Sequence, residues 1–188
     1  VYPLKVKNED YKQCEYCNLK IHYKQQFCTG CKSYIDLGIT VKSHHKELAI
    51  KALLEDNNIE FRHDSIVNEG CSKRRPDFVI NKLNGDFVIL EVDEFQHKRK
   101  TYTCECEITR MKQIFFDIGV SNVTFIRYNP DSYKSNKQET NTQREDFLIR
   151  LIKKEIKKDS EYPLSVVYLY YDHFDRHNYE FENIDPYI

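Results

Sequence analysis

The chain has 188 residues, of which 40% are apolar and 31% are charged, and its formal net charge is −1. This length and apolar content suffice for one core of ordinary size plus a small appendage. No run approaches the ~18 apolar residues of a membrane span and no signal peptide is visible, so we expect a soluble, intracellular protein that is neither secreted nor membrane-bound.

Charge is unevenly distributed along the chain. Residues 1–42 hold seven lysines against four acidic residues, whereas residues 159–188 hold seven acidic residues against one arginine. This polarity fits DNA contacting the first part and the middle of the chain while the acidic end packs away or meets a partner. We expect three parts: a small module over 1–42, a main domain over 43–158, and a strand with an acidic tail over 159–188.

Two CxxC motifs, separated by ten residues, stand in the first part. Each can place two thiolates on one tetrahedral Zn²⁺ ion, which makes the segment a zinc ribbon. A segment this polar needs a bound metal to hold a fold, so the zinc is structural. Two disulfides are the alternative, which an intracellular location disfavours. The predicted zinc ligands are Cys14, Cys17, Cys28 and Cys31.

The main domain is predicted to begin with a helix and a β-hairpin. Ser43 is a suitable N-cap, and apolar residues recur at helical spacing up to about Asn57. Two apolar runs, 78–80 and 87–90, then flank an Asn-Gly-Asp sequence, which is the pattern of two strands joined by a tight turn.

Each hairpin strand carries acidic residues at one end. Asp77 precedes the first strand, whereas Glu91 and Asp93 close the second. Alternation along a strand places Glu91 and Asp93 on one face, and pairing brings Asp77 close to them. Three converging carboxylates repel one another unless a cation lies between them, so we expect a hard divalent ion. The alternative is an amphipathic hairpin whose exposed face is acidic.

Basic residues lie on both sides of this acidic stretch, which suits a polyanionic substrate. Gln96 and His97 follow the acids, and histidine is the usual group for proton transfer near neutral pH. The pattern favours metal-assisted hydrolysis of phosphodiester bonds. The predicted DNA contacts around it are Arg74, Arg75, Lys98, Arg99 and Lys100.

These motifs resemble a known superfamily. Pro-Asp at 76–77, followed by Glu-Val-Asp at 91–93, resembles the signature of the PD-(D/E)xK nucleases. The continuation to Gln-His at 96–97 is similar to the very-short-patch-repair (Vsr) branch of this superfamily. That branch also contains homing endonucleases. The resemblance covers roughly residues 43–131. It implies an α/β (α+β) fold of the restriction-endonuclease-like type, with a mixed sheet flanked by helices.

The resemblance also implies roles for individual residues. Asp77 would be the central ligand of Mg²⁺ or Mn²⁺, Glu91 or Asp93 a second ligand, and His97 the proton-transfer group. A helix before the hairpin commonly contributes a glutamate in such nucleases, and Glu47 is the matching position; the alternative is that it complements the helix dipole. The chain departs from the pattern because Asp93 stands where the superfamily has lysine.

The chain beyond the motif is predicted to contain a loop over 101–106 and a helix over 107–119. Arg110 on this helix could bind the scissile phosphate, or it could form a surface salt bridge with Glu107. A strand over 123–128 follows, and the resemblance makes its Arg127 a candidate phosphate contact.

The last third is predicted as a polar linker over 132–141, a helix over 145–158 and a β-segment over 164–171. We expect this β-segment to add an edge strand that is paired within the chain or across a homodimer. The predicted function is a metal-dependent DNA endonuclease with a homing, repair-nicking or restriction-like role. The alternatives are an inactive nuclease-fold DNA-binding or scaffold protein and a zinc-ribbon transcription-associated factor.

Overall fold

The structure is a computed structural model that describes residues 11–13, 20–27, 32, 44–63, 76–93, 104–135 and 139–188. The chain divides into two compact units, Val1–Ala52 and Leu53–Ile188. The described part of the smaller unit includes an antiparallel pair of short strands, β1 (Tyr11–Gln13) and β2 (Lys20–His22). The helix expected after Ser43 is α2 (His44–Asp56), which contains the unit boundary.

Six described strands of the larger unit form one mixed, open sheet in the order β3-β4-β5-β6-β7-β8. Neighbouring strands are antiparallel from β3 to β5, parallel from β5 to β7, and antiparallel between β7 and β8. The α/β class predicted from the sequence is therefore confirmed, with a mixed sheet and three described helices. The strands are β3 (Arg62–His63), β4 (Phe78–Asn81), β5 (Phe87–Val92), β6 (Val123–Tyr128), β7 (Leu164–Leu169) and β8 (Glu182–Ile184).

The predicted hairpin is present as β4 and β5. The Lys82 amide donates to the Asp86 carbonyl at 2.8 Å and closes the turn. Gly85 has a φ of +89°, a left-handed conformation that other residues adopt at a cost, and the Asn84 side chain accepts the Asp86 amide at 3.1 Å. The turn residues thus set the strand register, in which Val79 lies opposite Ile89.

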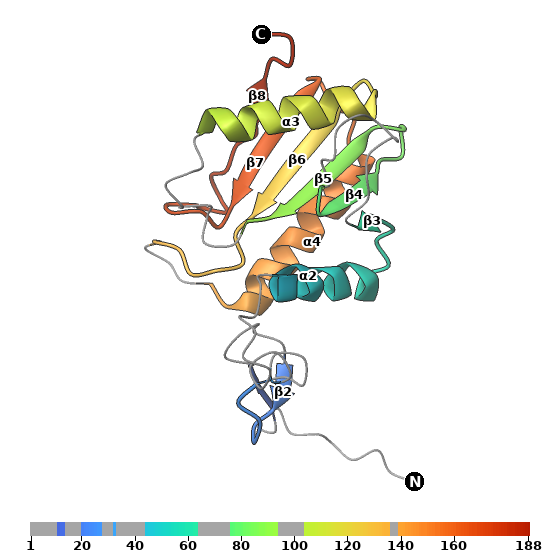
Figure 1. Ribbon diagram of the computed structural model, residues 1–188. Helices are drawn as coiled ribbons and strands as arrows, with labels where there is room; N and C mark the ends of the chain where they lie inside the picture. Colours follow the sequence, from blue (N-terminus) through green and yellow to red (C-terminus); the bar gives the residue numbers. More distant parts are fainter. Residues whose placement is uncertain are drawn as a thin grey trace. The chain divides into compact units, whose positions relative to one another are not determined.

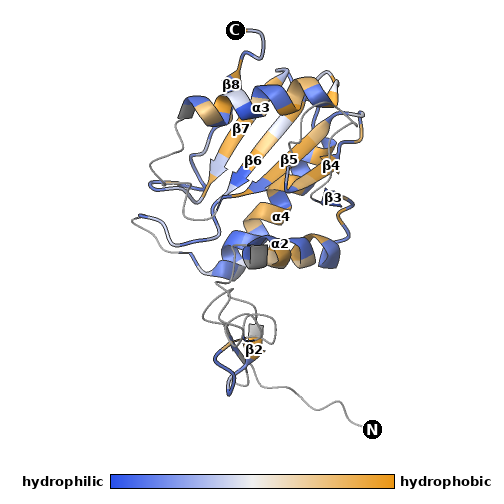
Figure 2. Ribbon diagram, viewed as in Figure 1, coloured by the Kyte–Doolittle hydropathy of each residue, from blue (hydrophilic) through white to orange (hydrophobic). Residues whose placement is uncertain are grey.

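Two helices cover opposite faces of the sheet (Figure 1). The first is α3 (Cys104–Ile118), and the second is α4 (Asn141–Lys157). Apolar residues concentrate in the strands and on the helix sides that face them (Figure 2). The core on the α3 side includes Met111, Ile114, Phe115 and Ile118 of the helix and Val79, Ile89, Phe125 and Val166 of the strands. The buried apolar residues of α4 are Leu148, Ile149, Leu151 and Ile152.

A buried arginine fixes α4 to the ends of β6 and β7. The guanidinium of Arg144 lies 4.6 Å from the ring centre of Tyr170, 5.3 Å from that of Tyr133 and 5.6 Å from that of Tyr128. It also donates to the carbonyl of Asn129. Burial raises the pKa of Tyr128 to about 12, so this hydroxyl stays protonated at neutral pH. The cation–π contacts hold the strand ends in place from the face opposite α3.

Both helices begin earlier than predicted. Helix α3 starts at Cys104, so part of the expected loop over 101–106 is helical, and its two first-turn glutamates suit the positive end of the helix dipole. Helix α4 starts at Asn141 because Thr140 and Gln143 form a capping box. The Thr140 hydroxyl accepts the Gln143 amide at 3.3 Å, and the Gln143 side chain accepts the Thr140 amide at 3.0 Å.

The β-segment predicted at 164–171 is present as β7 and pairs within the chain as expected, but it is not an edge strand. Strand β7 pairs with β6 on one side and with β8 on the other, so it lies inside the sheet. The partner comes from the acidic tail, in which Glu182–Ile184 forms the three-residue edge strand β8. Such a short edge limits pairing with other chains. None of the described helices combines the length and the apolar composition that crossing a bilayer requires.

Candidate functional site

The candidate site lies where the parallel strands β5 and β6 end, on the sheet face that α3 covers. Glu91 of β5 is the register partner of Arg127 of β6. Each lies two positions after a residue that packs against α3, Ile89 or Phe125, and therefore shares that face of the sheet. The chain leaves β5 at Asp93, whose amide donates to the carbonyl of Tyr128 at 2.8 Å. The carboxyl ends of parallel strands are a common place for ligand-binding residues in open α/β sheets.

Asp77 joins this site from the neighbouring antiparallel strand. Phe78 pairs with Leu90, so the residue before Phe78 lies opposite Glu91 and shares its face of the sheet. The Asp77 carboxylate accepts the amide of Val92 at 2.7 Å and is half-buried. The strand register thus puts Asp77 opposite Glu91, and the hydrogen bond holds one oxygen of Asp77 at the strand end.

Glu91 forms an ion pair with the helix that covers it. One guanidinium nitrogen of Arg110 lies 2.6 Å from the Glu91 carboxylate, whose side chain is only 7% exposed, whereas that of Arg110 is 34% exposed. Burial raises the pKa of Glu91, and the nearby charge of Arg110 opposes this effect without cancelling it. Arg110 thus reaches the sheet, whereas Glu107, its predicted alternative partner, lies 2.9 Å from Arg127.

A buried network surrounds Asp93. Arg127 donates to both Asp93 oxygens, from Nε at 2.6 Å and from Nη2 at 2.8 Å, and the Tyr171 hydroxyl donates to Oδ2 at 2.6 Å. Another nitrogen of Arg127 lies 2.9 Å from Glu107. Burial lowers the pKa of Arg127, but its bonds with Asp93 outweigh that effect, so the net shift is upward and the charge is permanent.

Arg127, the predicted DNA-phosphate contact, lies inside this network. Arg127 is 3% exposed, and its guanidinium is shared between Asp93 and Glu107. Asp93 is 1% exposed and both its oxygens accept hydrogen bonds. We therefore interpret the Asp93–Arg127 pair as a unit that positions the end of β5.

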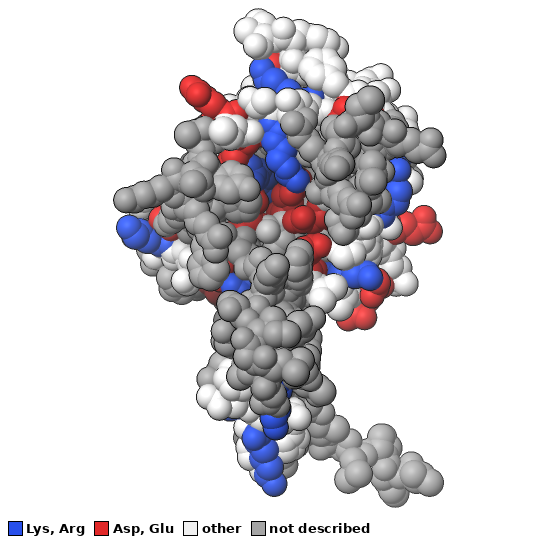
Figure 3. All heavy atoms as spheres, viewed as in Figure 1, with Lys and Arg blue, Asp and Glu red and all other residues white. Residues whose placement is uncertain are grey.

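The described site carries more negative than positive charge. Four carboxylates, those of Asp77, Glu91, Asp93 and Glu107, surround the guanidiniums of Arg110 and Arg127. Figure 3 shows acidic side chains gathered near the middle of one face of the molecule, with basic side chains beside them. Within the part of the chain that the structure describes, no three or more His, Cys, Asp or Glu side chains form a group that could hold a metal ion.

The other predicted residues lie in the smaller unit or outside the described residues. Glu47 lies in the first turn of α2 and is half-buried, within the smaller unit. The predicted proton-transfer and zinc-binding residues and most predicted DNA contacts lie outside the described residues. They are Gln96, His97, Cys14, Cys17, Cys28, Cys31, Arg74, Arg75, Lys98, Arg99 and Lys100.

Tyr171 is the site residue that the sequence analysis missed. It follows β7, and its hydroxyl reaches Asp93 across 78 positions of the chain. Burial raises its pKa, and the adjacent Asp93 carboxylate raises it further, so the hydroxyl stays a donor at neutral pH. The only sequence signal is a tyrosine-rich stretch after residue 167, which does not indicate which ring turns toward the site.

Comparisons with protein-family models, with curated proteins and with solved structures found no match to this chain. The nuclease superfamily therefore remains a resemblance carried by the motif residues.

Proposed function

We propose that this chain is a metal-dependent DNA endonuclease of the PD-(D/E)xK type. The observation that carries the proposal is the placement of Asp77 and Glu91, opposite each other on one face of the hairpin, where β5 and β6 end beside Arg110. Two carboxylates and a partly exposed arginine at the strand ends are groups that metal-assisted hydrolysis of a phosphodiester can use.

The donor chemistry of this pair fits Mg²⁺ or Mn²⁺. Mg²⁺ is commonly held by one or two carboxylates together with waters and substrate phosphate oxygens, so a group of three protein ligands is not required. The excess of carboxylates over guanidiniums also favours a cation. Asp77 and Glu91 would hold the ion, which when bound polarises a phosphate and lowers the pKa of a water.

The remaining residues have distinct roles in this proposal. Arg110 is the one cation of the described site that is partly exposed, and its release from Glu91 would let it bind the scissile phosphate. The Asp93–Arg127 pair positions the strand end, and Tyr171 keeps Asp93 in place. His97 would move a proton, with Gln96 beside it, and the zinc ribbon and the basic residues around the motif would bind the DNA backbone.

The arrangement of Arg110 also supports a second candidate, a nuclease-fold protein that binds DNA without cleaving it. Arg110 lies within 2.6 Å of Glu91 and already neutralises it, so the carboxylate has a partner without any metal. Such a protein would bind DNA equally well with or without Mg²⁺ and would not depend on the charge of Asp77.

Cleavage of supercoiled plasmid separates the two candidates. The wild type and Asp77→Asn are each incubated with Mg²⁺, with Mn²⁺ and with EDTA, and nicked and linear products are quantified. The asparagine side-chain oxygen can still accept the Val92 amide, so the variant loses the charge and keeps the hydrogen bond. Asp146→Asn, an exposed carboxylate of α4, is the matched control.

We expect metal-dependent cleavage by the wild type and by Asp146→Asn. In Asp77→Asn we expect a loss of at least about 100-fold, because loss of an outer-shell partner of a metal ligand already costs about 10–100-fold. Nicked product would favour a repair-nicking role, and linear product a homing or restriction-like role. Absence of cleavage by the wild type, with DNA binding intact, would favour the non-cleaving protein.

A further inference from the structure

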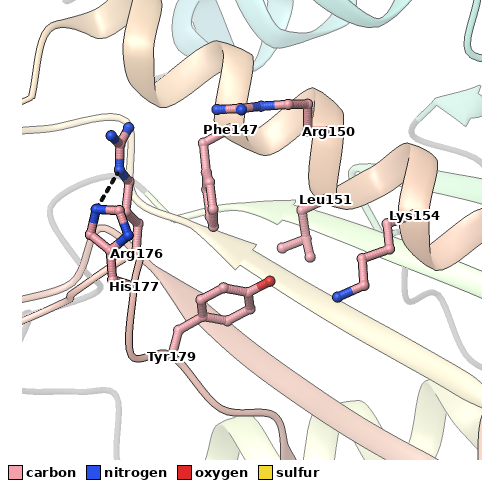
Figure 4. Close-up of a pocket in the computed structure, with 7 residues that line it drawn as sticks. All are labelled: Phe147, Arg150, Leu151, Lys154, Arg176, His177 and Tyr179. Carbon is pink, nitrogen blue, oxygen red and sulfur yellow. Dashed lines mark hydrogen bonds between the residues drawn. The ribbon is translucent and has the colours of Figure 1, made fainter.

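A hollow lies on the α4 side of the sheet, on the face opposite the carboxylate site. It has a volume of about 320 Å³ and forms between α4 and the segment after β7. Figure 4 shows Phe147, Arg150, Leu151 and Lys154 contributed by the helix, with Arg176, His177 and Tyr179 facing them from the other side. The volume is at the lower end of the range of small-ligand sites, which is ~300–1,000 Å³.

The rim of the hollow is cationic on both sides. Arg150 and Lys154 lie one helical turn apart and are exposed, and no described carboxylate forms an ion pair with either. Arg176 is held by Glu139 at 3.4 Å and donates to the His177 ring at 3.4 Å. The residues that line the hollow include no aspartate or glutamate, so the charges of Arg150 and Lys154 face an open space without a carboxylate partner among the described residues. Such a place favours an anion.

The floor of the hollow is aromatic and apolar. The rings of Phe147 and Tyr179 meet edge to face, with centres 5.4 Å apart, and both are half-buried. Leu151 between them is 3% exposed. A floor of this kind suits the planar face of a ring system rather than a fully hydrated ion.

We propose that this hollow binds a nucleotide, with the phosphate between Arg150, Lys154 and Arg176 and the base against Phe147 and Tyr179. An arginine side chain can donate two parallel hydrogen bonds to two oxygens of one phosphate. Nucleobases stack on aromatic side chains with little dependence on which base it is. The nucleotide is either a free mononucleotide or one unit of a single-stranded nucleic acid, since both present the same phosphate and base. Binding here is separate from the proposed hydrolysis, because the two sites lie on opposite faces of the sheet.

Calorimetric titration of the full chain, without added Mg²⁺ or Mn²⁺, tests the proposal. The probes are thymidine 5′-monophosphate, thymidine, inorganic phosphate and an eight-residue oligothymidylate. We expect the monophosphate or the oligonucleotide to bind at least tenfold more tightly than thymidine or phosphate alone. Arg150→Ala/Lys154→Ala should weaken this binding at least tenfold.

The matched control is Lys153→Ala/Lys157→Ala, which removes two exposed charges from the same helix outside the hollow. It should change the affinity less than twofold, and circular dichroism should show both variants folded. Tighter binding of the oligonucleotide than of the monophosphate identifies a single strand as the source, and equal binding identifies a free nucleotide. No saturable binding of either, equal binding of inorganic phosphate, or an equal loss in the control would overturn the proposal.

Discussion

Removing one partner of the buried Asp93–Arg127 pair should destabilise the fold strongly. Arg127→Met keeps the aliphatic part of the side chain and removes the guanidinium. The Asp93 carboxylate, which is 1% exposed, then loses both hydrogen bonds from Arg127 and keeps the one from Tyr171. In Asp93→Asn the guanidinium of Arg127, 3% exposed, keeps Glu107. Each change leaves a charge in a poorly solvated place without its main partner.

The size of the effect follows from these contacts. Breaking a buried, hydrogen-bonded ion pair from one side costs about 3–5 kcal/mol of unfolding free energy. At roughly 3 °C per kcal/mol for a unit of this size, the melting temperature should fall by about 10–15 °C. Arg150→Met is the control: its exposed guanidinium donates to a carbonyl of its own helix, so its removal should change stability by less than about 0.5 kcal/mol.

A double-mutant cycle measured by urea unfolding tests the coupling directly. Because each single variant already lacks the pair, Asp93→Asn/Arg127→Met should lose less stability than the sum of the single losses, by at least about 1 kcal/mol. Additivity within about 0.3–0.5 kcal/mol would refute the interpretation of Asp93 and Arg127 as one positioning unit.

Two further predictions concern titration and metal content. Because burial raises the pKa of Glu91 above its ordinary value of 4.5, the folded chain binds this proton more tightly than the unfolded chain. Its contribution to stability is therefore full below pH 4.5 and is lost as the pH rises through the raised pKa. The unfolding free energy of the wild type should fall relative to that of Glu91→Gln as the pH rises above 4.5, and a constant difference would contradict this. Atomic absorption should find one zinc ion per chain, and this ion should be absent in Cys14→Ser and in Cys28→Ser. The control is Cys106→Ser, which removes an exposed thiol of α3 and should retain the zinc. A zinc-free wild type would contradict the predicted zinc ribbon.

Local patterns in the sequence were enough to predict several elements and part of the site. The Asn-Gly-Asp turn and the apolar runs around it define the β4–β5 hairpin, and alternation along β5 places Glu91 and Asp93 on one face. Strand β6 matches the predicted bounds of 123–128. These features depend on neighbouring residues, so strand periodicity and turn chemistry suffice to predict them.

Contacts between distant residues could not be read from the sequence. Arg127 is 34 positions from Asp93 and Tyr171 is 78 positions from it, so only the order of the strands decides that they meet. The interior position of β7 could not be predicted either, because it depends on β8 pairing with the other side of that strand. Nor could the hollow beside α4, which forms where residues of the helix and of a later loop meet. Sequence alone determined which chemical groups stand at the strand ends, whereas the tertiary structure decided which charges neutralise one another, because pairing depends on distances in space between segments far apart in the chain.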